Sequence, residues 1–134
     1  MAPERCGTET VDVPLQISTV VFDARDAVGL AVFWAEALGW VARSPDDAGC
    51  VVVAPNAGVA PFILLFIPVP EPKRSKNRMH VDVNPIGADA DLELARLLSL
   101  GARSIDVGQD NERWHVLADP EGNEFCLLHH RLGR

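Results

Sequence analysis

Two segments with helical periodicity in this 134-residue chain end in the same Leu-Gly dipeptide, and this repetition constrains the fold most strongly. The dipeptides are Leu38-Gly39 and Leu100-Gly101, 62 positions apart. In each case a strand-like segment begins about twenty residues before the glycine, and three more strand-like segments follow the glycine. Glycine at this position typically ends a helix in the left-handed conformation. The predicted order is therefore βαβββ twice, which indicates that one structural unit is repeated.

The first copy, module one, is assigned residues 16–70. Its helix is predicted from apolar residues at helical spacing, with Asp26 placed as the N-cap and Gly39 as the end. A β-branched strand is expected before the helix at residues 17–22. The three later strands are expected at residues 40–43, 50–54 and 62–67, separated by turns rich in proline, aspartate and glycine.

The second copy, module two, is assigned residues 77–130. A strand is expected at residues 78–83 and a helix at 89–100, whose first turn carries aspartates that favour the helix dipole. The later strands are expected at residues 102–106, 114–118 and 124–129, with a tight Asp-Pro-Glu-Gly-Asn turn before the last. The proline-rich residues between the modules predict a connector. Residues 1–15 lack periodicity and predict a mobile tail, which leaves 16–134 as one domain.

The composition argues against two classes of partner. The formal net charge is −7, whereas a nucleic-acid-binding protein usually presents a basic face. No apolar run approaches the length needed to cross a membrane, so no membrane partner is expected. The three cysteines, Cys6, Cys50 and Cys126, form no CxxC motif. We therefore expect reduced thiols and a cytoplasmic location.

Four segments, at residues 26–40, 77–83, 95–103 and 118–127, resemble the glyoxalase-like branch of the vicinal-oxygen-chelate superfamily, which includes glyoxalases, bleomycin resistance proteins and dioxygenases. The most specific are DAVGLAVFWAEALGW and ADPEGNEFCL. The resemblance implies an α+β fold in which two βαβββ modules form an open, cupped eight-stranded barrel with the helices outside. It also implies a small-molecule ligand in the cup and a homodimer. It names no particular reaction, because function depends on the site rather than the fold.

Relatives that bind a divalent metal take ligands from the first and fourth strands of each module, and these are usually His, Gln or Glu. The resemblance places the four positions near Thr19, near Leu65 or Ile67, at His80 and at Cys126. Only His80 belongs to the usual ligand types. The chain is therefore expected to lack a complete standard metal site. No cofactor is expected, and a divalent metal is disfavoured.

Strand alternation would place three polar side chains, Arg78, His80 and Asp82, on one face. Asp82 is expected to orient His80, and Arg78 to pair with Asp82 or to meet an anionic ligand. An alternative metal site would combine His80, Asp82 and His115. Cys126 lies in an apolar strand and is expected to be buried and inert.

Three hypotheses for the function follow. The favoured one is a small-molecule-binding protein with a largely apolar cavity. The second is a metal-dependent lyase, isomerase or dioxygenase with a non-standard ligand set around His80. The third is a metal-free enzyme that uses His80 as acid or base, oriented by Asp82. In all three the expected cavity residues are Thr19, Leu65, Ile67, Arg78, His80 and Cys126.

Overall fold

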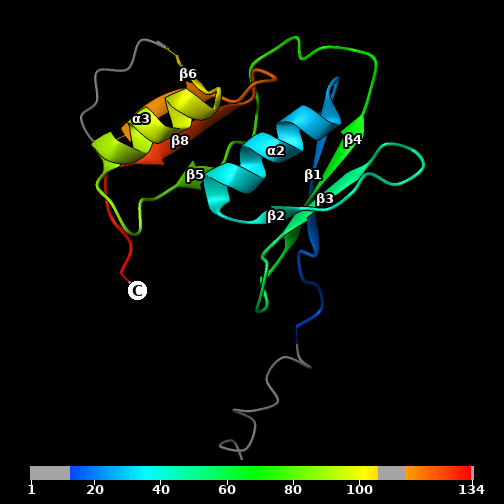
Figure 1. The fold of residues 1–134 in the computed structure, drawn as a ribbon, viewed down its shortest axis with the longest axis horizontal. Coiled ribbons are helices and arrows are strands. Elements are labelled where there is room, and N and C mark those ends of the chain that lie inside the picture. The colour runs from blue at the N-terminus through cyan, green and yellow to red at the C-terminus, as the bar shows by residue number, and fades with distance from the viewer. Residues whose placement is uncertain (1–12, 106–113, 134) are drawn as a thin grey trace, which may run out of the picture.

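A computed structural model of the chain describes residues 13–105 and 114–133. Within these residues the fold consists of two four-stranded mixed sheets and two helices (Figure 1). Sheet A, from module one, has the order β1-β4-β3-β2, and sheet B, from module two, has the order β5-β8-β7-β6. None of the helices in this part of the chain is long and apolar enough to span a membrane.

The elements follow the predicted order. Those of module one are β1 (Thr19–Ala24), α2 (Ala27–Leu38), β2 (Val41–Ala42), β3 (Val51–Ala54) and β4 (Ile63–Pro68). Those of module two are β5 (Asp82–Val83), α3 (Ala90–Leu100), β6 (Arg103–Ser104), β7 (Trp114–Ala118) and β8 (Glu124–Leu128). In each module the first strand runs parallel to the fourth, and the other pairs are antiparallel. The shared topology confirms the internal repeat.

Both helices begin and end where the sequence indicates. The carboxylate of Asp26 accepts a hydrogen bond from the backbone N–H of Gly29 at 3.0 Å, and Asp89 accepts one from Leu92 at 2.9 Å. Each bond satisfies a backbone donor that has no partner within the helix. Gly39 ends α2 at φ 71°, and Gly101 ends α3 at φ 123°.

The predicted strand at residues 78–83 is wrong in its length, because only Asp82–Val83 forms β5. The register explains this difference. β5 pairs only with β8, Asp82 stands opposite Cys126, and β8 begins just two residues earlier at Glu124. The Glu124 carboxylate instead accepts a hydrogen bond from the backbone N–H of Asn77 at 2.9 Å. His80 therefore precedes the strand, in a segment that is held by side-chain contacts.

Other boundaries differ by smaller amounts. β6 covers only residues 103–104 of the predicted 102–106, and residue 106 lies outside the described part of the chain. Most of the predicted tail, residues 1–12, also lies outside it, and the mobility of the tail stays a prediction. Residues 13–17 are exposed and carry no regular structure.

The predicted eight-stranded barrel is not confirmed, because sheets A and B are separate among the described strands. Their first strands, β1 and β5, each lie at a sheet edge. Figure 1 shows α2 between the two sheets, where it packs on β3 and β4 and also contacts α3. Helix α2 is apolar around most of its circumference, so it can pack against sheet A with one face and against α3 with another.

The centre of the core is aromatic. Trp34 of α2 lies 5.9 Å from Phe22 and 5.0 Å from Phe125, measured between ring centroids. Phe22 also stacks on Phe66 at 5.0 Å. Because Phe125 belongs to sheet B and the other rings to module one, this cluster joins the two modules through apolar contact.

Candidate functional site

Three side chains capable of binding a metal meet on one face of sheet B. Asp82 and Cys126 are directly opposite each other in the parallel β5–β8 pair, so their side chains point to the same face. His80 lies two residues before Asp82, and its Nε2 is 3.2 Å from Asp82 Oδ1. One ligand atom from each residue lies within 4.8 Å of the other two. We call these three residues the His-Asp-Cys cluster.

The cluster is open to solvent on one side. The side chains of His80 and Asp82 are 47% and 49% exposed, and Cys126 is half-buried rather than fully buried. Desolvation raises the pKa of the Cys126 thiol, and the negative charge of Asp82 and a hydrogen bond to it act in the same direction. The isolated thiol is therefore protonated at neutral pH and is a weak nucleophile. Cys126 is thus less buried than we expected, and its inertness stays a prediction.

The structure does not bring His115 into this cluster. His115 is opposite Leu127 in the β7–β8 pair, so it lies on the other face of sheet B from Cys126. Its Nε2 is instead 3.1 Å from Nε2 of His129. The alternative site of His80, Asp82 and His115 is therefore wrong, because adjacent residues of a strand point to opposite faces.

A cavity of about 440 Å³ lies between the modules. Apolar and aromatic side chains from both modules form much of its wall, and the connector between the modules closes one side. Its lining comprises Val20, Val21, Phe22, Asp23, Trp34, Val69, Glu71, Pro72, Lys73, Asn77, Met79, His80, Val81, Glu121, Asn123, Glu124 and Phe125. We call it the inter-module cavity. Of the six residues expected to line a cavity, His80 is in this set.

The other expected cavity residues lie elsewhere. Thr19, Leu65 and Ile67 share the face of sheet A that points away from α2, because the alternate residues Leu64 and Phe66 are buried on the helix side. All three are half-buried. Arg78 is exposed in the segment of module two that precedes β5. Cys126 belongs to the neighbouring His-Asp-Cys cluster. Whether these residues contact a ligand stays a prediction.

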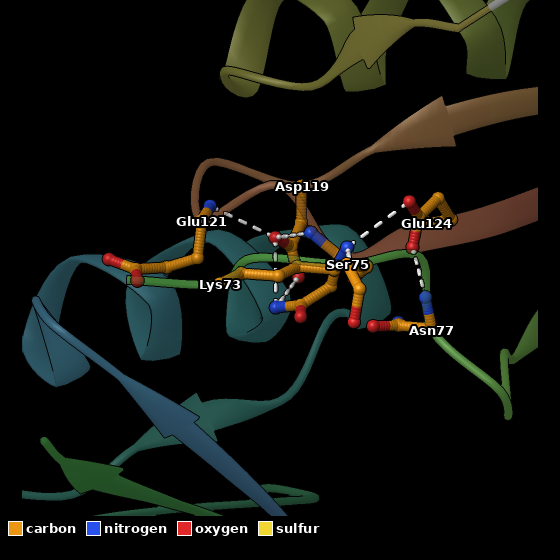
Figure 2. Close-up of polar contacts among 7 residues, drawn as sticks. Lys73, Ser75, Asn77, Asp119, Glu121 and Glu124 are labelled. Carbon is orange, nitrogen blue, oxygen red and sulfur yellow. Dashed lines mark hydrogen bonds and ion pairs between the residues drawn. The ribbon is translucent and has the colours of Figure 1, made fainter. Parts of the chain in front are cut away.

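Polar contacts anchor the connector to β8 (Figure 2). The ammonium of Lys73 donates to the backbone carbonyl of Ser75 and lies 3.2 Å from Glu124 Oε2. The other oxygen, Glu124 Oε1, accepts from the backbone N–H of Asn77. Burial raises the pKa of Glu124, but the hydrogen bonds from Asn77, its own backbone and Lys73 outweigh burial and lower it. One carboxylate thus fixes the segment that carries His80.

The tight turn between β7 and β8 has a role that the sequence did not reveal. Asp119 is fully buried, and its Oδ2 accepts a hydrogen bond from Trp34 Nε1 at 3.0 Å. Its Oδ1 accepts from the backbone N–H groups of Glu121 and Asn123. Desolvation raises the pKa of Asp119, although all these hydrogen bonds oppose the shift. The sequence predicts only a turn at Asp-Pro-Glu-Gly-Asn, whereas in the structure this turn also joins the modules.

Glu121, in the same turn, also links module two to module one. Its carboxylate accepts hydrogen bonds from the backbone N–H groups of Arg25 and Asp26, at 2.9 and 3.0 Å, where α2 begins. Figure 2 shows its side chain extending away from Asp119 toward this helix end. A carboxylate there is favoured by the helix dipole. The sequence shows only that the turn is acidic, and this does not predict that Glu121 binds the backbone of Asp26, which is 95 residues away.

Comparison with protein families places this geometry in a known class. The glyoxalase-like domain family matches residues 19–128, and the chain therefore belongs to that family. A comparison with curated protein sequences finds no match. The family assignment agrees with the paired βαβββ topology and identifies a member of the vicinal-oxygen-chelate superfamily.

Solved structures with the same fold come from several bacteria. A glyoxalase/bleomycin resistance protein/dioxygenase family enzyme from Burkholderia phytofirmans is 17% identical, with a TM-score of 0.62 over 84% of this chain and 97% of the other. A fosfomycin resistance protein from Listeria monocytogenes, complexed with Mn(II) and a dihydroxypropylphosphonic acid, is 10% identical, with a TM-score of 0.65 over 87% and 90%. An antibiotic-binding protein from a Streptomyces species is 20% identical, with a TM-score of 0.53 over 85% and 94%. At these identities the likeness shows the fold alone.

Proposed function

We propose that this glyoxalase-like protein binds a small molecule with a substantial apolar part in the inter-module cavity. The observation that carries the proposal is the composition of the cavity wall. The side chains of Phe22, Val69 and Met79 provide an apolar surface, and the polar groups of Asn77 and His80 lie at the same cavity. Ligand pockets commonly combine mostly apolar walls with a few polar groups that orient the ligand. The volume of about 440 Å³ is within the usual range for such pockets.

Titration with a neutral apolar dye, Nile red, tests this proposal. Val69 lines the cavity and is half-buried, so Val69→Trp is expected to fill part of the space and to weaken binding at least about tenfold. Val59→Trp is the matched control, because Val59 is 99% exposed and outside the cavity lining. Equal dye affinity in the two variants would show that the cavity does not take the ligand. Compounds that displace the dye would then identify the chemical class of the natural ligand.

We further propose that the protein acts as a homodimer. The face of sheet A away from α2 carries Val21, Leu65 and Ile67 beside Thr19 and Asp23, and Val21 is 51% exposed. The corresponding face of sheet B carries the His-Asp-Cys cluster. A sheet with an apolar face is stabilised when another layer covers it. A second copy that placed its sheet A against sheet B would cover both faces and enclose the cluster.

The oligomeric state is measurable by light scattering or sedimentation. Val21→Asp is expected to reduce the proportion of dimer, because it puts a charge into the covered face. Val28→Asp is a suitable control, since Val28 is 48% exposed on α2. A monomeric wild-type protein at micromolar concentration would reject this proposal. We also propose a cytoplasmic location, supported by the free thiols of Cys50 and Cys126.

The contact between His80 and Asp82 supports an enzymatic alternative without metal. Asp82 Oδ1 lies 3.2 Å from His80 Nε2, close enough for the carboxylate to orient the imidazole. In this alternative, the ring nitrogen that is not bound to Asp82 exchanges a proton with a substrate. Turnover of an aldehyde, epoxide or catechol in the presence of EDTA, lost in His80→Gln, would support it. Turnover that persists in His80→Gln would exclude this role for the ring.

A further inference from the structure

Cys126 changes the chemistry that the His-Asp-Cys cluster can offer. The cluster provides one imidazole nitrogen, one carboxylate oxygen and one sulfur, all within 4.8 Å of one another. Sulfur ligands select borderline and soft metals, whereas carboxylates and water suit Mg²⁺ and Mn²⁺. Three protein ligands and an open position are typical of catalytic Zn²⁺ sites. The donor set therefore fits a borderline divalent metal.

We propose that His80, Asp82 and Cys126 form a three-ligand site that prefers Zn²⁺ and Co²⁺ over Mn²⁺, with Cys126 bound as thiolate. The metal replaces the thiol proton, which is released to solvent. This proposal deepens the metal-dependent alternative for function and does not depend on a ligand in the inter-module cavity. The remaining coordination position on the solvent-exposed side is open to water or a substrate oxygen.

The positions of the three residues make this geometry attainable. Ligand atoms around a tetrahedral Zn²⁺ lie about 3.4–3.7 Å apart, as follows from the usual Zn–N, Zn–O and Zn–S bond lengths. The His80–Asp82 distance of 3.2 Å is already close to this value, and the largest separation in the cluster is no more than 4.8 Å. A contraction of about 1 Å is within the reach of side-chain rotation. The backbone pairing of Asp82 with Cys126 already fixes two ligands side by side.

Other groups near the cluster do not compete for this role. His115 and His129 bind each other on the opposite face of sheet B. Glu124 precedes Cys126 by two residues, but its carboxylate is held by Lys73 and Asn77. Cys50, the other described free thiol, lies in module one just before β3. These residues provide controls for the experiment.

Titration of the metal-free full-length protein with Co²⁺ is the direct test, because thiolate ligation produces a near-ultraviolet charge-transfer band. We expect a one-to-one titration in the wild type and loss of this band in Cys126→Ser. His80→Gln is expected to weaken Co²⁺ binding at least about tenfold. Zn²⁺ should displace Co²⁺, whereas Mn²⁺ should bind at least about 100-fold more weakly than Zn²⁺. Cys50→Ser and His115→Gln should leave the titration unchanged.

Cys126→Glu provides a second variant in case Cys126→Ser does not fold, which circular dichroism would reveal. A carboxylate at this position should abolish the charge-transfer band and reduce the preference for Zn²⁺ over Mn²⁺ at least about tenfold. A charge-transfer band that survives in both Cys126 variants, or binding that is lost in His115→Gln, would overturn the proposal. Wild-type protein that binds no Co²⁺ would also overturn it. Nile red binding measured in EDTA reports on the cavity separately, so the two proposals fail independently.

Discussion

Module one and module two place different side chains on equivalent surfaces of the same topology. The face of sheet A that points away from α2 carries Leu65 and Ile67, whereas the corresponding face of sheet B carries Asp82 and Cys126. Leu65 and Ile67 lie on the fourth strand of module one, whereas Asp82 and Cys126 lie on the first and fourth strands of module two. The repeat thus preserves the backbone arrangement, whereas among the described residues only module two brings His, Asp and Cys ligand atoms within 4.8 Å of one another.

The helices differ in a related way. Helix α2 buries six residues, including Leu30, Phe33 and Trp34, whereas α3 buries only Ala90 and Leu97. Most of the aromatic core therefore belongs to module one. Module two depends on that core through Phe125 and Asp119, which both contact Trp34. The comparison indicates that module one supplies much of the packing energy and that module two supplies the polar groups.

Trp34→Ala should have the largest effect on stability, because Trp34 connects the cores of the two modules. The substitution removes the ring contacts with Phe22 and Phe125 and leaves the buried carboxylate of Asp119 without one donor. We expect the free energy of unfolding to fall by about 3–5 kcal/mol. Urea denaturation measures it. Leu92→Ala on α3 is the control, because Leu92 is 63% exposed and should change stability by less than about 0.5 kcal/mol.

Trp34→Phe separates the two contributions. It keeps an aromatic ring in the core but removes the donor to Asp119, so an intermediate loss of about 1–3 kcal/mol is expected. If Trp34→Ala costs no more than Leu92→Ala, the two modules do not share a core through this residue.

A smaller effect should distinguish the two Leu-Gly helix ends. Gly39 has φ 71° and ψ 27°, close to the left-handed region that asparagine also tolerates. Gly101 has φ 123° and ψ 2°, where residues with a Cβ are strained. We expect Gly101→Asn to cost about 1–3 kcal/mol and Gly39→Asn less than about 1 kcal/mol. Thermal denaturation of both variants measures the difference, and equal losses would mean that the two ends are interchangeable.

The smallest effects should appear in the pH dependence of stability, with opposite signs at Asp119 and Glu124. The pKa of Asp119 is raised in the folded protein, so its contribution is fully present below its ordinary value of 3.8 and is lost as pH rises through the folded pKa. The pKa of Glu124 is lowered, so its contribution is present above its ordinary value of 4.5 and is lost as pH falls through the folded pKa.

In Asp119→Asn, the decrease in stability that accompanies rising pH should therefore become smaller. In Glu124→Gln, the decrease in stability that accompanies falling pH should become smaller. Unfolding free energies from about pH 3 to about pH 7 test both signs. Asp91→Asn serves as a control on the exposed first turn of α3. Parallel pH profiles for the wild type and both test variants would contradict the assignment.

The sequence by itself determined the repeat, the α+β class and the helix ends, because these depend on neighbouring residues. Asp26 and Gly39 define α2 through local capping, and alternation along a strand predicts which side chains share a face. The placement of Asp82 and Cys126 on one face of sheet B required the β5–β8 register, which no local signal specifies. The length of β5 likewise depended on where its partner strand begins.

Only the tertiary structure decided which distant groups meet. It placed Asp119 in hydrogen-bond contact with Trp34, Glu121 at the start of α2, and Cys126 beside His80 and Asp82. It also separated His115 from that cluster and left the two sheets apart. The physical reason is common to these cases. Local propensity acts over a few residues, whereas these contacts depend on long-range strand pairing and on burial of an aromatic core shared by both modules.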